Sequence, residues 1–428
     1  MRIGLFTDTY HPSTNGVVFV VDFTRECLEK LGHEVFIYCP DEKLIKAPGH
    51  KKKIDKNIIR LPSLPTVGPD APRTALFVRS RLMKKIDEHN LDASVFFTPM
   101  TVGVMALFAA KKNGTIVIAQ HSSDLHRTMD FYPTQIKPVL AFAPLIISMS
   151  TKMNRKKVKA LAKIYMPDRS TSDKWSKRAL DTQLAVTYSS CDAVIAVSHK
   201  SERQIKSFTK GTGTDIRVIP TGVDPLPKPT VRKITKLRQK FGIKPDDEVM
   251  IYFGRIGEEK DLKFLFPVLE RVVRRRPKAK LLLCGDNEYR AELMEIAAKS
   301  PVADRIIFAG RYKRNDIPAF CAMSKVYVFP STFDTQGLTL HEAASSGLPI
   351  VLIDGPVTEV VKFGYNGFIV RKSYNDFAGR VIQILSDQKL AEKFSENSKK
   401  IASEFTQLGQ TEKMVDLIDE KLKARDKV

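Results

Sequence analysis

The chain has 428 residues and a formal net charge of +22, with 43% hydrophobic and 28% charged residues. A domain usually holds ~100–200 residues, so the length favours two domains of similar size, and the composition excludes a largely disordered chain. The five cysteines are widely spaced and form no CxxC pair. This excludes a disulfide framework and a structural zinc site, and it predicts a reduced, cytoplasmic protein.

The first half of the chain reads as alternating strands and helices. Strands are predicted over residues 1–9 and 33–39, around a helix over 18–31 that ends at Gly32. Later strands over residues 93–97 and 115–119 enclose a helix over 101–110, and strands over 191–198 and 215–225 follow. Such βαβ units predict a parallel sheet with right-handed crossovers. Because the chain enters a strand at once, an export signal is not expected.

The pattern begins again after the segment PLPKP, which we interpret as a linker over residues 225–229. Strands are predicted at VMIYFG, AKLLLCG, RIIFAG and VYVFPS, each followed by a helix, and the chain from Tyr374 onward reads as helices. The fold class is therefore α/β, with an N-terminal Rossmann-like domain over residues 1–225 and a C-terminal one over 226–428. We expect a ligand between the two.

A basic segment over residues 133–181 belongs to neither pattern. An apolar run, PVLAFAPLIISMS, leads into TKMNRKKVKALAKIYM, where aliphatic residues recur at helical spacing among lysines. The run is shorter than the ~20 residues that span a bilayer. A basic amphipathic helix can lie on an anionic membrane surface, or it can pack against its own domain. Nucleic acid is not expected as a partner, because few aromatic residues interleave the charges.

The stretch over residues 329–349, FPSTFDTQGLTLHEAASSGLP, predicts an anion site. A strand runs into a turn at Gly337, carboxylates at Asp334 and Glu342 flank it, and the free amides of the next helix suit a phosphate. Arg255 and Lys260 follow another strand end of the same half, where they can bind a diphosphate. Each of these residues alone is more often a surface charge or a cap.

Two residues of the first half lie at predicted strand ends as well. Gly16 belongs to the turn after the first strand, which is not a GxGxxG dinucleotide fingerprint. His121 follows the strand over residues 115–119. The carboxyl ends of parallel strands are where such sheets bind ligands. A single histidine is nevertheless more often a structural hydrogen-bonding residue.

With these residues noted, the chain resembles the retaining family-4 glycosyltransferases of the GT-B fold over nearly its whole length. The matching motifs run in order: NGV, the crevice His121, CDAVIAVS, VIPTGVD, FGRIGEEKD, LLLCGD, AGRYKRNDI and FPSTFDTQGLTLHEAASSGLP. The turn TQGLT and the basic first half are similar to the diacylglycerol glucosyltransferases and other glycolipid synthases. The resemblance implies two Rossmann-like domains that face each other across a central cleft, with the last helix crossing back to the first domain.

The resemblance also assigns roles to residues. Arg255 and Lys260 would hold the diphosphate of a nucleoside diphosphate sugar such as UDP-glucose, and Glu342 would bind the ribose. As catalytic residues, His121 would contact the sugar near the reacting centre and Asp334 would bind the sugar. The other donor-binding residues would be Gly16, Arg311, Tyr312, Gly337, Leu338 and Thr339. Asp334 departs from the family pattern, which has a glutamate there, and this puts the donor preference in doubt.

The expected reaction transfers a hexose, with glucose first in mind, to a membrane lipid hydroxyl such as that of diacylglycerol. It would retain the anomeric configuration and need no metal or other cofactor. A double displacement and a same-face attack both remain open. The expected location is the inner face of the cell membrane, reached through residues 133–181. The alternatives are a soluble sugar, sugar phosphate or glycan as acceptor, and a non-catalytic nucleotide-sugar-binding scaffold.

Overall fold

The computed structural model describes residues 1–13, 15–41, 55–64, 74–75, 84, 86–125 and 172–426. These residues form two compact units. The first comprises Met1–Pro220 together with Gln410–Val428, and the second comprises Thr221–Gly409. The predicted boundary at residue 225 lies five residues beyond this division. Most of the basic segment, residues 133–171, lies outside the described residues.

The first unit contains a seven-stranded sheet in the order β3-β2-β1-β6-β7-β8-β9, and every pair of neighbours is parallel. A short antiparallel pair, β4 and β5, accompanies it. The strands are β1 (Arg2–Phe6), β2 (Glu34–Pro40), β3 (Ile58–Leu61), β4 (Ser63–Leu64), β5 (Thr74–Ala75), β6 (Ala93–Phe96), β7 (Ile116–His121), β8 (Ala193–Ala196) and β9 (Ile216–Val218).

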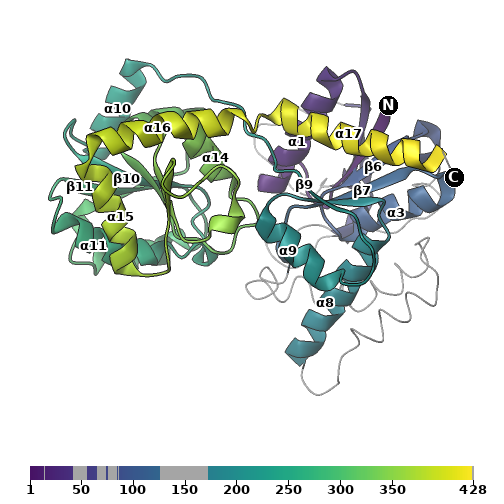
Figure 1. Ribbon diagram of the computed structural model, residues 1–428, viewed down its shortest axis with the longest axis horizontal. Helices are drawn as coiled ribbons and strands as arrows, with labels where there is room; N and C mark the ends of the chain where they lie inside the picture. The colour runs from purple at the N-terminus through teal and green to yellow at the C-terminus, as the bar shows by residue number, and fades with distance from the viewer. Residues whose placement is uncertain are drawn as a thin grey trace. The chain divides into compact units, whose positions relative to one another are not determined.

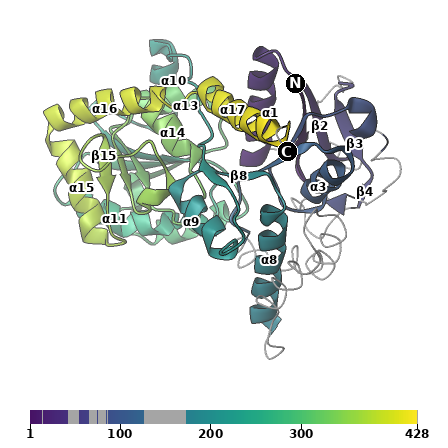
Figure 2. The same cartoon turned by 45° about the vertical axis from the view of Figure 1, so that its right-hand side comes forward.

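Helices lie on both faces of this sheet, as expected where parallel strands are joined by crossovers (Figures 1 and 2). The helices are α1 (Gly16–Lys30), α3 (Thr101–Asn113), α8 (Ser172–Ser189), α9 (His199–Phe208) and α17 (Gln407–Asp426). The last of these returns to the first unit, where Lys421 Nζ donates to Asp215 Oδ2 over 2.6 Å. The chain therefore finishes on the unit in which it began.

The second unit contains a six-stranded parallel sheet in the order β12-β11-β10-β13-β14-β15. Helices cover both of its faces, with α11 and α15 together on one and α14 packed against α16 on the other (Figure 1). The strands are β10 (Glu248–Phe253), β11 (Ala279–Cys284), β12 (Ile306–Gly310), β13 (Val326–Phe329), β14 (Ile350–Leu352) and β15 (Gly367–Ile369). The helices are α10 (Val231–Phe241), α11 (Leu265–Val273), α12 (Arg290–Ala298), α13 (Ile317–Ala322), α14 (Leu338–Ser345), α15 (Tyr374–Ser386) and α16 (Gln388–Ser403).

The inner strands of the second unit read as near-continuous apolar runs because both faces of the sheet are buried there, whereas the edge strand β12 is only partly buried. The central strand β10 is fully inside from Val249 to Phe253, and stacked aromatic rings of Tyr252, Tyr327 and Phe329 join it to β13. Burying each such side chain contributes about 1.5–3 kcal/mol. The predicted α/β class with two Rossmann-like units is thus confirmed. Among the described helices, none combines the length and apolarity needed to cross a membrane.

Candidate functional site

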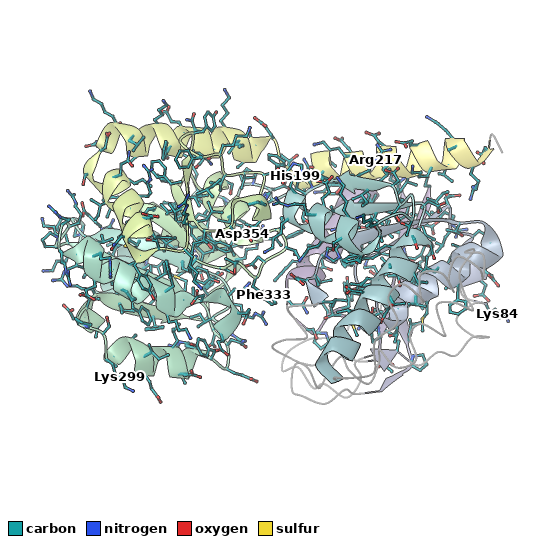
Figure 3. The ribbon with its side chains drawn as sticks, turned by 60° about the horizontal axis from the view of Figure 1, so that its bottom comes forward. Lys84, His199, Arg217, Lys299, Phe333 and Asp354 are labelled. Carbon is teal, nitrogen blue, oxygen red and sulfur yellow. The ribbon has the colours of Figure 1, made fainter. Side chains whose placement is uncertain are left out.

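The strand order of the second sheet marks its ligand-binding edge. Strand β10 lies between β11 and β13, so the order reverses there, and ligands bind outside the carboxyl ends of strands at such a switch point. Arg255 follows β10, and Asp334 follows β13. Phe333 and Asp354, which come after β13 and β14, lie at this edge, whereas Lys299 at the end of α12 lies on the other side of the unit (Figure 3). The predicted anion site therefore occupies the switch point.

The turn before α14 presents free amides at this edge. Gly337 adopts φ 67°, a left-handed conformation that favours glycine, and it leaves α14 to begin at Leu338 without a side-chain cap. Leu340 is fully buried and anchors the first helical turn, while Tyr327 Oη donates to Thr339 Oγ1 over 2.8 Å. The backbone amides of Leu338 and Thr339 belong to the first turn, which has no carbonyl acceptor within its own helix. They suit an anion.

Lys260 and Asp334 form an ion pair. Lys260 Nζ lies 2.5 Å from Asp334 Oδ1, and Ser331 Oγ donates to the other carboxylate oxygen over 2.6 Å. The Lys260 side chain is 11% exposed and the Asp334 side chain 17%. Lys260 Nζ also lies 5.5 Å from the ring centroid of Phe333, within the range of a cation–π contact. The two residues to which the sequence assigned separate parts of a donor are therefore in direct contact.

Arg255 pairs with a buried acid that the sequence analysis did not identify. Arg255 Nη2 lies 2.5 Å from Glu259 Oε1, and the Glu259 side chain is only 2% exposed while that of Arg255 is 46% exposed. A Cβ on Gly257 would lie 2.1 Å from Glu259 Oε2, so the carboxylate packs directly against this glycine. Glu259 thus fixes one end of the guanidinium and leaves the rest of it at the surface.

Glu342 is buried in α14 and has a cationic partner. Arg314 Nε donates to Glu342 Oε1 over 2.8 Å. Burial raises the pKa of the Glu342 carboxyl above its ordinary value, and the hydrogen bond from Arg314 opposes that rise. Tyr312 is partly buried, and burial raises the pKa of its hydroxyl, with the nearby Glu342 carboxylate adding to the rise. Arg311 is exposed, and its Nε lies 3.8 Å from Asp286 Oδ2.

In the first unit, Gly16 is the first residue of α1. Asn15 caps the helix, since its Oδ1 accepts from the amides of Val17 and Val18 over 3.0 and 3.1 Å. Asn15 Nδ2 donates to Thr9 Oγ1 over 2.9 Å, which ties the cap back to the chain after β1. A Cβ on Gly16 would meet no atom within 4 Å. The glycine is therefore not required by packing within the described chain.

His121 ends β7 and is 3% exposed. Its Nδ1 lies 2.8 Å from Tyr188 Oη, and the two rings meet edge to face at 5.7 Å between centroids. Elsewhere in the first unit, Asp8 after β1 accepts hydrogen bonds from Thr98 Oγ1, Thr101 Oγ1 and the amide of Val102. These bonds join the ends of β1 and β6, which flank the point where the order of the first sheet reverses.

The structure adds partners that the sequence analysis missed: Ser331 for Asp334, Glu259 for Arg255, Arg314 for Glu342 and Tyr327 for Thr339. A signal existed for Tyr327, because a tyrosine inside an apolar strand needs a partner for its hydroxyl. Arg314 lies 28 residues before Glu342, and spacing alone cannot pair them. Among the described residues, no three His, Cys, Asp or Glu side chains are grouped as metal ligands would be.

Comparison with known proteins agrees with this architecture. The sequence model for "Glycosyltransferase Family 4" matches residues 14–225, and that for "Glycosyl transferases group 1" matches residues 233–401. The chain belongs to the family-4 glycosyltransferases. This glycosyltransferase is 26% identical over 415 residues to the alpha-monoglucosyldiacylglycerol synthase of Streptococcus pneumoniae, covering 93% of this chain and 82% of the relative. It is 26% identical over 408 residues to the alpha-monoglucosyldiacylglycerol synthase of Acholeplasma laidlawii, covering 93% and 92%.

Among solved structures, this glycosyltransferase is similar to HepE of Anabaena in complex with UDP and glucose. The TM-score is 0.65 at 16% identity, and the match covers 97% of this chain and 98% of HepE. At that identity the match shows the fold alone. The predicted membership in the GT-B family-4 glycosyltransferases is thus confirmed, and the overall sequence resembles the glycolipid synthase branch.

Proposed function

We propose that this glycosyltransferase transfers a hexose, with glucose the first candidate, from a nucleoside diphosphate sugar to a membrane lipid hydroxyl such as that of diacylglycerol. The anomeric configuration is retained, and no metal takes part. The observation that carries the donor half is the contact of Lys260 with Asp334 beside the free amides of α14. The acceptor half is supported by the two relatives that are named alpha-monoglucosyldiacylglycerol synthase.

The donor half follows from the charges at the switch point. A diphosphate at this place would accept hydrogen bonds from the two amides at the start of α14. It would also meet two positive charges, the Lys260 ammonium and the exposed part of the Arg255 guanidinium. Asp334 accepts hydroxyls of the sugar, and the Glu342 carboxylate accepts those of the ribose. HepE, which has the same fold, was solved with UDP and glucose, and we assign the same donor class here.

In the reaction, the bond between the anomeric carbon and the diphosphate breaks and its electron pair leaves with the nucleoside diphosphate. The acceptor oxygen bonds to the anomeric carbon, and its proton passes to the departing phosphate or to solvent. Negative charge grows on the diphosphate as the bond breaks. Fixed cations and amides stabilise such charge because they need no reorganisation. Lys260 and the turn at Gly337 act at this step.

The lipid acceptor rests on two relatives that match nearly the whole chain and are both named alpha-monoglucosyldiacylglycerol synthase. A net charge of +22 fits attachment to an anionic surface, where each Lys or Arg contributes ~1 kcal/mol. We assign this attachment to the basic segment 133–181 and place the enzyme on the cytoplasmic face of the membrane. The same protein then holds a soluble donor on one unit and a lipid on the other.

The test incubates the purified full chain with UDP-glucose and lipid vesicles that contain diacylglycerol, and identifies products by mass. A hexosyl lipid with the α configuration is expected. A product formed only from added sugars or sugar phosphates would replace the lipid by a soluble acceptor, and donor binding without any product would favour a scaffold. In a parallel flotation assay, binding to vesicles with anionic lipid should weaken with salt. Equal binding to neutral vesicles would overturn the electrostatic attachment.

A further inference from the structure

The chain connects the two units at two places, and both connections lie side by side. It enters the second unit at Thr221 and leaves it after Gly409. The segments 221–224 and 405–407, here called the connecting segments, are hydrogen-bonded, since the amide of Val223 donates to the carbonyl of Phe405 over 3.0 Å. The amide of Gln407 donates to Asp224 Oδ1 over 2.8 Å. The two segments therefore form a single clasped connection.

Gly222 makes this close approach possible. A Cβ at this position would lie 2.2 Å from the carbonyl oxygen of Thr406, a distance that no side chain tolerates. The contact is backbone against backbone, so a flexible side chain cannot relieve it. The glycine at position 222 therefore allows the two connecting segments to pack backbone against backbone.

Gln336 joins the connecting segments to the turn of residues 334–337, here called the donor turn. It immediately precedes Gly337, and its side chain is buried, with 4% of the residue exposed. The amide of Thr221 donates to Gln336 Oε1 over 3.0 Å, and Gln336 Nε2 donates to the carbonyl of Thr221 over 2.8 Å. This two-bond pairing fixes which side of the glutamine amide carries the oxygen. It also ties the turn of residues 334–337 to the first residue of the second unit.

His341 supports the glutamine from α14. Its Nε2 lies 3.2 Å from Gln336 Nε2, and since an amide nitrogen only donates, the imidazole Nε2 is the acceptor. The imidazole proton then sits on Nδ1, which is buried without a hydrogen-bond partner in the described structure. Burial lowers the pKa of His341 to about 3, so the ring stays neutral. Its edge meets the ring of Phe405 at 6.0 Å between centroids, at the second connecting segment.

An apolar side chain at position 341 would avoid a buried donor without a partner, which is costly in a protein interior. The histidine keeps that donor and gains a contact with Gln336 on one side and Phe405 on the other. These contacts all converge on the glutamine or on the connecting segments. They tie the turn to Thr221.

We propose that Gln336 is a positioning residue that couples the donor turn of residues 334–337 to the clasped connection between the units. The donor turn is then ordered only when the connecting segments are ordered, and the reverse also holds. By thermodynamic linkage, a donor that orders the turn also orders the connecting segments. The inference that a nucleoside diphosphate occupies the turn rests on the proposed function, whereas the coupling itself rests on the Gln336 contacts. Gln336 does not touch the reacting atoms.

The test measures backbone hydrogen exchange by mass spectrometry on the full chain, with and without UDP. The variants are Gln336→Met, which keeps the volume and loses both bonds to Thr221, and Gln336→Asn, which keeps an amide too short to reach both atoms. The matched control is Gln183→Leu, which removes another buried glutamine whose Nε2 donates to the carbonyl of Pro99 over 3.0 Å in the first unit.

Without UDP, exchange over residues 219–226 and 334–345 should rise about tenfold in both Gln336 variants and stay unchanged in Gln183→Leu. With UDP, wild type should be protected in both segments, whereas the Gln336 variants should be protected only in residues 334–345. Their donor KM should rise about tenfold, with a smaller change in kcat. Wild-type exchange in both Gln336 variants, or UDP protection of residues 219–226 that survives them, would overturn the coupling.

This experiment can refute the proposed donor and the proposed role of Gln336 independently of each other. If wild type shows no response to UDP or UDP-glucose, the proposed donor is wrong, but the exchange rates without UDP still decide the role of Gln336. If one variant does not fold, the other carries the same comparison. A His341→Leu variant, which leaves both Thr221 bonds in place, should raise exchange less than either Gln336 variant does. An effect equal to that of Gln336→Met would assign the coupling to His341 instead.

Discussion

Replacing Asp334 with asparagine should tighten the binding of UDP while it lowers sugar transfer. In the structure Lys260 Nζ is held 2.5 Å from Asp334 Oδ1, so a diphosphate must compete with this carboxylate for the ammonium group. The Asp334→Asn variant keeps the shape and an acceptor oxygen but removes the competing charge. Transfer should fall because the sugar loses the charged acceptor that we propose for its hydroxyls.

The size of the change follows from the ion pair. A hydrogen bond to a charged group contributes about 1.5–3 kcal/mol. If about half of this opposes UDP, its removal gives about 0.75–1.5 kcal/mol, or about three- to tenfold tighter binding. Lys260→Ala should weaken UDP binding about a hundredfold, because it removes the cation to which we assign the diphosphate. It should also lower stability by about 1–3 kcal/mol, since it removes a cationic partner from a mostly buried carboxylate.

Isothermal titration with UDP measures both affinities, and a coupled assay measures transfer. The matched control is Asp247→Asn, because Asp247 pairs with Lys280 at 2.8 Å, is similarly buried, and precedes β10 at the opposite edge of the sheet. That control should leave the affinity for UDP unchanged. If Asp334→Asn weakens UDP binding as strongly as Lys260→Ala does, the carboxylate does not compete with the diphosphate and the reasoning is refuted.

Three further predictions concern single positions. Gly16→Ala should leave the thermal midpoint unchanged, since its Cβ meets nothing within 4 Å, but it should lower transfer about tenfold; full turnover would remove Gly16 from the site. Because burial raises the pKa of Glu342, UDP affinity should decline as pH falls through that raised value. Arg314→Leu removes the group that opposes the rise, so affinity measured against pH should decline at a higher pH, and an unmoved profile would contradict the pairing. Gly222→Ala should cost about 1–3 kcal/mol in urea unfolding, because its Cβ meets the Thr406 carbonyl at 2.2 Å, and an unchanged midpoint would show that the clasp adapts.

Much of the local structure around the donor turn, from Val326 to Ser345, could be predicted from its amino-acid sequence. The strand VYVF, the glycine and the apolar helix LTLHEAAS each follow from local preferences, and the structure places them at Val326–Phe329, Gly337 and Leu338–Ser345. Gly337 has a left-handed φ, as a strand-to-helix turn often requires. These properties depend on neighbours within a few residues, so the sequence contains them.

The charge partners at the site could not be predicted in the same way. Lys260 and Asp334 are 74 residues apart, and they meet because β10 and β13 are adjacent in the sheet. Likewise, Arg314 reaches Glu342 from the loop that follows β12. A spacing pattern identifies charged residues near strand ends, but strand order decides which of them touch. The sequence motifs therefore predicted that Lys260 and Asp334 contact different parts of a donor, whereas in the structure the two side chains form an ion pair with each other.

For the basic segment 133–181, the prediction rests on the sequence. Its sequence predicts either a surface for anionic lipid or a helix that packs against its own domain, and residues 133–171 lie outside the described structure. The prediction stands on charge and helical spacing, and vesicle binding will decide it.

The sequence by itself determined the α/β class, the two Rossmann-like halves and the family, because periodicity and ordered motifs are local properties of the chain. Only the tertiary structure decided that Asp334 is paired with Lys260, that Arg314 accompanies Glu342, and that Gln336 binds Thr221 across 115 residues. The physical reason is that charges and amides buried on folding must find partners, and the sheet order determines which partners are within reach.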